Sequence, residues 1–449
     1  SNNDGGTSNT IFGYLAGDKI ESGGTDNTLI GKQAGNQTTY GITTGDYNTA
    51  VGSSALGASA AAHITGSSNT AIGYNAMLEA QGAVASNTAI GSSSLKNITT
   101  GSRNIAIGSA AGQALTESEK NIAIGSDALY YASSDADENI AIGNNCMAGN
   151  FSTAAVHDCV AIGSDALDAV LTSTASGSVA IGKSALTALT SGAGNVAIGA
   201  SALATEDGAG YSTAIGYQAL KDQNGATTAS DNTAVGYQAA LDITTGLKNV
   251  ALGTYALGNS LLPDSCVAIG YLAAGTGVLT AAADGTVAIG DSALTALTSG
   301  IGNVAVGFQA GMAATDNSRN TVMGHGAYRY STSSDDNVVV GFNALRNAGS
   351  ANAGSNKNIA IGSYALDAAD GGENDNIAIG YDAMGNANNS STEFNIAIGN
   401  YTLDAIAGNT QTGTIAIGHQ ALTALTTGTN NVAVGYQSML ETTGGNYNT

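Results

Sequence analysis

The chain has 449 residues and a formal net charge of −22, from 34 acidic and 12 basic residues, and it contains 63 Gly, one Pro and no Trp. A nucleic-acid-binding surface needs clustered Lys or Arg, and a transmembrane helix needs about 20 consecutive apolar residues. The sequence has neither feature, so we expect no nucleic acid partner and no membrane insertion. The acidic excess suits a long, repetitive surface that must stay soluble.

A five-residue phrase that ends in glycine recurs twenty-four times, from Asn9–Gly13 to Asn431–Gly435, and successive glycines lie 17 to 21 residues apart. Asn stands four positions before the glycine in 18 copies, and Ala stands two positions before it in 20 copies. The consensus is N-[TIV]-A-[IV]-G-x-x-A-L, followed by a variable stretch rich in small and polar residues. A fixed period of this kind identifies a repeat protein.

Each phrase is too short for a helix, and its β-branched residues between Asn and Gly predict a single strand. A unit of 17 residues buries its apolar side chains only by stacking, so the sequence predicts an all-β parallel β-solenoid of about 24 coils, either a β-roll or a β-helix. The segment A-L-T-A-L-T-S-G that begins at Ala185 and Ala293 is compatible with a second strand or tight bend, or with a helical turn.

No linker or shift in composition divides the chain, so we expect residues 1–449 to form a single solenoid domain. The sequence begins without Met and ends within what resembles the opening of another coil. We therefore expect both ends to continue into a longer chain or to meet stacked subunits.

The residue three positions before the glycine changes in blocks of consecutive coils. The blocks are Thr10, Thr28, Thr49, Thr70 and Thr88; Ile105, Ile122 and Ile140; Val160, Val179 and Val196; and Ile359, Ile377, Ile396 and Ile415. Identical side chains pack as ladders in parallel strands that stack in register, although recent duplication of neighbouring units would leave the same blocks. The asparagines are predicted to form a structural ladder that includes Asn27, Asn69, Asn104, Asn195, Asn303, Asn376 and Asn431.

Charged residues precede the Asn position in several neighbouring coils. Four consecutive coils carry Arg319, Asp336, Lys357 and Asp375, and another pair carries Asp231 and Lys248. If these residues form one column, each charge lies beside its opposite and helps to fix the register. Chance alternation on a solvated face is the alternative.

The first position after the glycine is often aromatic. The tyrosines at this position are Tyr14, Tyr74, Tyr217, Tyr237, Tyr271, Tyr381 and Tyr436, and Phe308 and Phe342 join them. They are expected to form one longitudinal stripe, which is a candidate surface for recognition of a glycan or a protein. The alternative is that these rings pack over the neighbouring coil or chain.

Residues suited to catalysis or metal binding are sparse. The four His, namely His63, His157, His325 and His419, are about ninety or more residues apart and are expected on the surface. The three Cys, namely Cys146, Cys159 and Cys266, form no CxxC motif and are expected to be small buried residues; a Cys146–Cys159 disulfide is an alternative. No coil breaks the pattern with convergent Asp, Arg or Lys, so we expect no enzymatic activity and no cofactor.

Two acidic turns suggest calcium as a ligand, because Ca²⁺ binds oxygen-rich loops. They are residues 135–138, with sequence DADE, and residues 370–375, with sequence DGGEND. The glycine-aspartate nonapeptide of calcium β-rolls is absent. We therefore expect these turns to hold no metal, with bound calcium as the alternative. The longest insertions follow Gly31, Gly52 and Gly341, and variable loops on a rigid scaffold are common sites of binding specificity.

The phrase also resembles known repeats. The segments GSVAIGKSA at 177–185 and GTVAIGDSA at 285–293 resemble the head repeats of trimeric autotransporter adhesins. The segments NTAVGYQAA from Asn232 and NVAVGYQSM from Asn431 resemble repeats in tail-fibre proteins of bacterial viruses. The resemblance implies a trimer of left-handed β-rolls in an extracellular attachment fibre. The coil here is longer than in the adhesin heads, which leaves the handedness and the cross-section open.

The alanine two positions before the glycine gives an independent sign of association. If the neighbouring Ile or Val fills the coil, this Ala points outward and allows another chain to approach closely. Alternatively, the coil is flat and the Ala faces a narrow core. The sequence therefore favours a non-enzymatic extracellular structural or adhesive fibre, trimeric, with a cell-surface glycan or protein as its receptor. A self-stacking filament subunit and an ice-binding solenoid that uses Thr10 to Thr88 are the alternatives.

Overall fold

The computed structural model describes residues 7–20, 23–36, 41–57, 62–132, 135–151, 154–225, 229–348, 354–388, 392–406 and 410–449. The fold is the predicted all-β parallel β-solenoid. The chain forms two compact units, Ser1–Ser230 (unit 1) and Asp231–Thr449 (unit 2). Both units consist of coils of the same kind, each made of one phrase and the turns that follow it.

Each phrase forms a strand of three residues, which is shorter than the five-residue phrase. Unit 1 contains β1 (Thr10–Phe12), β2 (Thr28–Ile30), β3 (Thr49–Val51), β4 (Thr70–Ile72), β5 (Thr88–Ile90), β6 (Ile105–Ile107), β7 (Ile122–Ile124), β8 (Ile140–Ile142), β9 (Val160–Ile162), β10 (Val179–Ile181), β11 (Val196–Ile198) and β12 (Thr213–Ile215). Unit 2 contains β13 (Thr233–Val235), β14 (Val250–Leu252), β15 (Val267–Ile269), β16 (Val287–Ile289), β17 (Val304–Val306), β18 (Thr321–Met323), β19 (Val338–Val340), β20 (Ile359–Ile361), β21 (Ile377–Ile379), β22 (Thr392–Glu393), β23 (Ile396–Ile398), β24 (Gln411–Thr412), β25 (Ile415–Ile417) and β26 (Val432–Val434).

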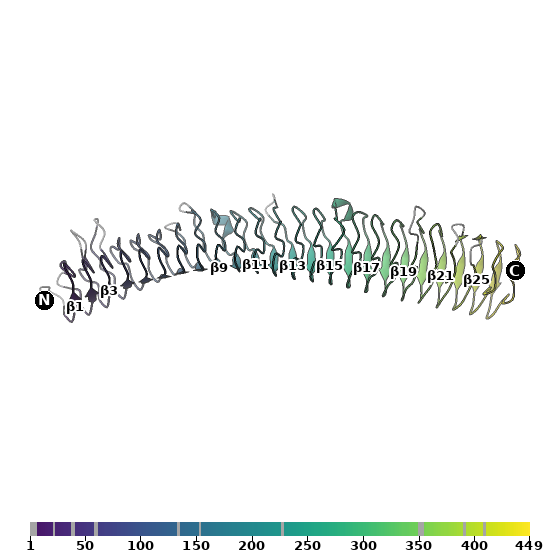
Figure 1. The fold of residues 1–449 in the computed structure, drawn as a ribbon, viewed down its shortest axis with the longest axis horizontal. Coiled ribbons are helices and arrows are strands. Elements are labelled where there is room, and N and C mark those ends of the chain that lie inside the picture. The colour runs from purple at the N-terminus through teal and green to yellow at the C-terminus, as the bar shows by residue number, and fades with distance from the viewer. Residues whose placement is uncertain are drawn as a thin grey trace. The chain divides into compact units, whose positions relative to one another are not determined.

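Within each unit, consecutive phrase strands pair in parallel and in register, as the blocks of identical residues predict. In unit 1, Thr70 pairs with Thr88 and Ala71 pairs with Ala89. In unit 2, Ile377 pairs with Ile396. Figure 1 shows the strands of each unit in a row along one side of the coils, with the connecting turns on the other side. The short strands β22 and β24 pair with each other outside this row.

The middle residue of each strand faces the core, so the expectation that the strand alanines point outward is wrong. In β7, Ala123 is buried, whereas Ile122 and Ile124 on either side of it are half-exposed. The physical reason is the thinness of the coil. A Cβ atom added to Gly112, in the facing turn, would lie 3.7 Å from the Cβ of Ala106 in β6. The space between strand and turn is narrow, and Ala occupies the middle strand position in 20 of the 24 phrases, so the alternative of a flat coil with a narrow core is correct.

The segment after the phrase is a series of tight bends. In the copy that begins at Ala185, Ser184 and Leu186 adopt left-handed backbone conformations with φ of 55° and 49°, and the N–H of Leu189 donates to the carbonyl of Leu186. The interpretation as a tight bend is therefore correct and the helical turn is wrong. The described residues contain two helical segments, the 3₁₀ turns η1 (Ser173–Ala175) and η2 (Ala281–Ala283). None of their helices is long and apolar enough to cross a membrane.

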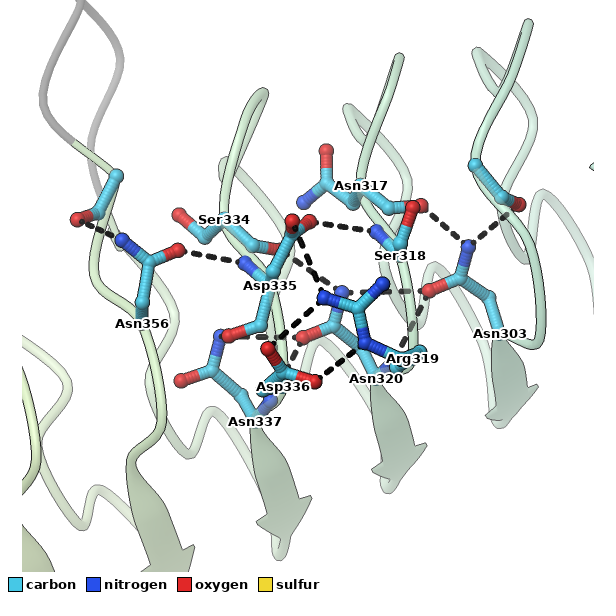
Figure 2. Close-up of polar contacts among 12 residues, drawn as sticks. Asn303, Asn317, Ser318, Arg319, Asn320, Ser334, Asp335, Asp336, Asn337 and Asn356 are labelled. Atoms are coloured by element: carbon cyan, nitrogen blue, oxygen red, sulfur yellow. Dashed lines mark hydrogen bonds and ion pairs between the residues drawn. The ribbon is translucent and has the colours of Figure 1, made fainter. Parts of the chain in front are cut away.

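The asparagines of the phrase lie in a buried column of hydrogen bonds (Figure 2). Asn337 donates from its backbone N–H to Asn320 Oδ1 at 3.0 Å and from Nδ2 to the same oxygen at 3.1 Å. The same Nδ2 also donates to the carbonyl of Ser355 in the next coil, at 2.8 Å. Asn337 thus ties its own strand to the coil before it and to the turn of the coil after it. Each asparagine named above for the ladder accepts at Oδ1 from a backbone N–H of the next coil. They are Asn27, Asn69, Asn104 and Asn195 in unit 1 and Asn303, Asn376 and Asn431 in unit 2.

A second column of polar side chains lies two positions before the asparagines. The N–H of Ser318 donates to Asp335 Oδ1, and the N–H of Asp335 donates to Asn356 Oδ1, both at 2.7 Å (Figure 2). A side chain of one coil therefore satisfies a backbone donor of the preceding coil. This column is not apparent in the sequence because Asp, Asn, Ser and His share the position, and any of them supplies an acceptor.

Candidate functional site

The outward side chains at the first and third strand positions form a surface with many exposed apolar residues, which we name the strand face. In unit 1, the exposed fraction of the side chains on this face is 38% for Ile72 and 37% for Ile107 and Ile215. In unit 2, the exposed fraction is 45% for Leu252 and 49% for Met323. Because the strands stack in register, the third-position side chains, which are all apolar, form a continuous strip along each unit, whereas the first position is Thr in eight of the phrase strands. A contiguous strip of this kind marks an interaction surface.

The seven tyrosines predicted to form a stripe all lie on the surface, in the turn that follows each strand. Their exposed fractions range from 42% for Tyr381 to 73% for Tyr436. In unit 1 the described contacts place no two of Tyr14, Tyr74 and Tyr217 ring against ring. Along the stack, two coils, those of Gly31 and Gly52, lie between Tyr14 and Tyr74.

In unit 2, eight aromatic rings form a continuous series of contacts, which we name the aromatic column. Neighbouring ring centroids are between 4.8 and 6.2 Å apart. The members in order are Phe308, His325, Phe342, Tyr364, Tyr381, Tyr401, His419 and Tyr436. Contacts between neighbouring coils cover part of each ring, which favours the alternative in which the rings pack over adjacent coils. Each such aromatic pair contributes about 0.5–1.5 kcal/mol to stability.

Two members of the column, Tyr364 and Tyr401, were not recognised in the sequence because they occupy the second position after the glycine. Both have left-handed backbones, with φ of 61° and 56°, and both replace a missing aromatic at the first position, where Ser363 and Asn400 stand. In these two coils the sequence shows the aromatic residue shifted by one position, from the first to the second after the glycine.

The four histidines do not come together. His325 stacks between two phenylalanines and His419 contacts two tyrosines of the aromatic column. His157 accepts a hydrogen bond at Nδ1 from the backbone N–H of Asp137. Within the described ranges, no group of three or more His, Cys, Asp or Glu residues is arranged to hold a metal ion.

The three cysteines are buried free thiols, so the Cys146–Cys159 disulfide is wrong. Cys146 donates through Sγ to the carbonyl of Ala161 at 3.1 Å. Burial raises the pKa of Cys146 to about 12 and that of Cys266 to about 11. A thiol that stays protonated in a closed core is a poor nucleophile and a poor metal ligand.

The predicted charge column is formed in part. Arg319 donates to both carboxylate oxygens of Asp336, from Nε at 2.6 Å and from Nη2 at 2.9 Å (Figure 2). This hydrogen bond to Arg319 holds the pKa of Asp336 below its usual value, and the charge of Lys357 lowers it further. Among the described ion pairs there is none between Asp231 and Lys248. Exposed pairs of this kind contribute about 0.2–1 kcal/mol, so they serve register more than stability.

The structure adds two ion pairs that sequence analysis did not predict. Arg103 Nη2 contacts Glu119 Oε2 at 2.6 Å, and Lys120 pairs with Glu138. The hydrogen bond to Lys120 lowers the pKa of Glu138. Both pairs join neighbouring coils of unit 1.

The two acidic turns considered for calcium direct several carboxylates toward protein donors. In the first turn, Asp137 Oδ1 accepts from the backbone N–H of Glu119 at 2.6 Å. In the second turn, Glu373 is buried, and its Oε2 accepts from Ser355 Oγ at 2.8 Å and from the N–H of Gly371 at 3.0 Å. These bonds give the carboxylates a structural role, and calcium binding stays a prediction.

Parts of the longest insertions, residues 37–40, 58–61 and 349–353, lie outside the described residues.

Three aspartates in neighbouring coils of unit 2 have perturbed pKa values. The pKa of Asp367 is raised to about 6, mainly by burial and also by the carboxylates of Asp382 and Asp404, against the lowering effect of Arg346. Burial also raises the pKa of Asp404 to about 6, with a smaller contribution from Asp382. These groups therefore titrate between their ordinary value of 3.8 and neutral pH.

We expect the double variant Asp367→Asn/Asp404→Asn to be more stable than the natural protein at about pH 7.5. A raised carboxyl pKa means that the folded state binds the proton more tightly, so the stability from protonation is present below 3.8 and is lost as the pH rises through about 6. The gain in melting temperature should shrink toward zero near pH 4. Circular dichroism melts across this range measure it.

The matched control for this experiment is Asp336→Asn, because the pKa of Asp336 is lowered. That variant is expected to be no more stable than the natural protein at neutral pH. A gain for Asp367→Asn/Asp404→Asn that is equally large at pH 4 and pH 7.5 would contradict the assignment.

Comparison with known proteins assigns the chain to no family: no family model matches it, and no curated protein matches it.

Proposed function

We propose that the chain is a non-enzymatic structural and adhesive fibre protein that acts outside the cell as a homotrimer. In this trimer the strand faces of three copies pack together around a common axis. The observation that carries the proposal is the strand face itself, a strip of half-exposed Ile, Val, Leu and Met side chains repeated in coil after coil.

A second copy of the chain is the partner that fits this strip best. The apolar residues recur once per strand, so only a surface with the same period matches them along a whole unit. Copies of the same chain supply that period, and oligomers of identical chains are the commonest assemblies of soluble proteins. Burying the strip contributes roughly 25 cal/mol per Å² of apolar surface, summed over many coils.

The number three comes from the resemblance to trimeric adhesin heads, and the narrowness of the strand face is consistent with it. Each strand offers only two outward side chains, for example Ile122 and Ile124 of β7, on either side of the buried Ala123. Three narrow strips close around an axis and leave the turns and aromatic residues outside. The turn side then remains free for attachment to a receptor.

The trimer is tested by replacing the two most exposed side chains of the strand face in unit 2 that lie inside the sheet. In the variant Leu252→Lys/Met323→Lys, a free face would accept both lysines, because each position is nearly half-exposed in the single chain. If the face is an interface, the charges are desolvated and the trimer dissociates. Light scattering coupled to size-exclusion chromatography should give three chains for the natural protein and one for this variant.

The matched control is Asn259→Lys/Asn347→Lys, which adds the same charge at two exposed turn positions of the same unit. This control should remain trimeric. A natural protein that elutes as a single chain would overturn the proposal, and so would a control that dissociates like the variant. Unlimited fibres in electron micrographs would instead support the self-stacking filament.

A further inference from the structure

A cleft of about 350 Å³ lies beside η1 in unit 1, where the 3₁₀ turn interrupts the regular bends of the coil. Its wall consists of the side chains of Ser173, Thr174, Ser176, Ser191 and Tyr211, together with Ala193 and two glycines. The volume lies within the range of small-molecule sites. No charged side chain lines it, although the chain as a whole is strongly acidic.

The aromatic wall of the cleft is held in place by the backbone. Tyr211 has a left-handed conformation with φ of 62°, and its N–H donates to the carbonyl of Ala193 at 3.0 Å. Its ring lies over Gly194, where an added Cβ would be 3.3 Å from the ring. The side chain is nevertheless 61% exposed, so one face of a fixed aromatic ring remains available to a ligand.

The opposite wall carries hydroxyl groups, some of which are already oriented. Ser176 Oγ donates to the carbonyl of Ser173 at 2.9 Å and accepts from the N–H of His157 at 3.1 Å. Thr174 Oγ1 lies 2.8 Å from Thr172 Oγ1. Uncharged hydroxyls opposite an aromatic face complement a neutral ligand that has one apolar face and a rim of hydroxyl groups. A pyranose sugar has this combination.

The chain contains an internal control, because residues 170–199 and 278–307 are near-duplicates 108 positions apart. Of the 30 aligned positions, 23 are identical and seven differ. The second copy also forms a 3₁₀ turn, η2, at the position equivalent to η1. The scaffold of the cleft is therefore present in both units.

The differences between the duplicates gather at the cleft. Four of the seven fall on lining positions, and two further lining positions beyond the duplicated window also differ. The pairs are Ser173 and Ala281, Thr174 and Ala282, Ser176 and Asp284, Ala193 and Ile301, Gly208 and Asp316, and Tyr211 and Arg319. The second copy keeps a serine, Ser299, at the position of Ser191, but it forms the same turn without the other three hydroxyl side chains and without the ring, so folding does not require these.

We propose that this cleft of unit 1 binds a neutral sugar unit. The ring of Tyr211 stacks on the apolar face of the pyranose, while the hydroxyls of Ser173, Thr174 and Ser191 exchange hydrogen bonds with its hydroxyl groups. The inference deepens the adhesive part of the proposed function by naming the chemical class of the receptor. It does not depend on the number of chains in the assembly.

The test uses saturation-transfer NMR on the full chain with four probes, the methyl glycosides of glucose, galactose, mannose and N-acetylglucosamine. At least one probe is expected to receive saturation from the protein. Tyr211→Ala should reduce its affinity at least tenfold, whereas Tyr211→Phe, which keeps the ring, should retain most of the binding. Tyr217→Ala is the matched control, because Tyr217 is an exposed tyrosine of the same unit outside the cleft.

A second variant guards against loss of binding through misfolding. Ser176→Asp/Ala193→Ile transfers two lining residues of the second copy into the first, in a scaffold that accommodates them in unit 2. It should fold, keep its number of chains by light scattering, and lose the saturation signal. Absence of signal with all four glycosides would overturn the inference, as would an equal loss of affinity in Tyr217→Ala. Neither result would affect the assembly measured with Leu252→Lys/Met323→Lys.

Discussion

Gly362→Ala is expected to unfold the coils around it. Gly362 has φ of +136°, and a Cβ atom at this position would lie 2.2 Å from the carbonyl oxygen of Gly380 in the next coil. The substitution therefore combines a strained backbone with a clash against main chain, which cannot move aside without breaking the β20–β21 pairing. Backbone strain and overpacking each cost about 1–3 kcal/mol, so together they are expected to lower the stability of these coils by about 2–6 kcal/mol.

Hydrogen exchange followed by mass spectrometry measures this effect locally, which suits a repeat structure in which each coil contacts mainly its neighbours. Peptides covering 355–385 should lose protection. The control is Gly302→Ala, because Gly302 also has a positive φ, +72°, but a Cβ there would meet no atom within 4 Å. That variant should lose only about 1–2 kcal/mol, the ordinary cost of a left-handed residue. Equal losses of protection in the two variants would show that the close approach of the backbones is not the cause.

The same close approach explains which part of the period is constant. The carbonyl of one phrase glycine lies against the α-carbon of the glycine in the preceding coil, for example Gly125 against Gly108. A residue inserted at this point would separate the two backbones. Insertions between the Leu and the next Asn only lengthen a turn, and this is where the period varies from 17 to 21 residues.

The fold was predictable from the sequence because its determinants are local and repeated. The phrase, its period and the blocks such as Thr49, Thr70 and Thr88 predict short parallel strands in register, and the structure has them. The orientation of the strand was not decided by the pattern. Alternation of Ile, Ala and Ile in β7 is compatible with either side facing inward, and the larger residue is usually the buried one.

The orientation is decided by the width of the coil, which depends on contacts between residues far apart in the period. The turn presents Leu129 to the core, and this side chain is fully buried with Ala123 and Ala128. The core is thus filled largely from the turn side, and the middle strand position is Ala except in four strands, which carry Ile11, Leu29, Val322 and Val339. This reversal turns the apolar Ile and Val side chains outward and creates the strand face, the surface on which the proposed assembly rests.

The candidate sites were predicted less completely than the fold. The tyrosine stripe was visible because its members share one position, but the aromatic column also uses Tyr364 and Tyr401 from another position. The cleft beside η1 was not recognised, since its lining comes from three consecutive coils and from a 3₁₀ turn that the sequence pattern does not signal. The differences between the near-duplicates 170–199 and 278–307 were a sequence signal that could have revealed it, because four of the seven fall on lining positions.

Asn358→Ala is expected to cause the second large loss of stability. Asn358 Oδ1 accepts from the backbone N–H of Asn376 at 3.0 Å and from its Nδ2 at 3.2 Å. Asn358 Nδ2 donates to the carbonyl of Glu373 at 2.7 Å. All these groups are buried, and removing the amide leaves at least two of them without partners. Each unsatisfied buried group costs about 1–3 kcal/mol, so a loss of about 2–6 kcal/mol follows. Hydrogen exchange in peptides covering 370–380 should report it.

The reverse substitution tests whether the column itself, and not the loss of volume, is responsible. Thr414 replaces Asn in the column and has no side-chain amide to continue it. Its Oγ1 is buried and has no hydrogen-bond partner. Its N–H already donates to Asn395 Oδ1 at 3.0 Å. Thr414→Asn would supply an Oδ1 acceptor for the N–H of Asn431 and continue the column, so exchange at Asn431 should slow. Two results would contradict this role of the column: faster exchange at Asn431 in Thr414→Asn, or unchanged exchange in peptides 370–380 in Asn358→Ala. Either would mean that the stability of the stack comes from strand pairing and the alanine core alone.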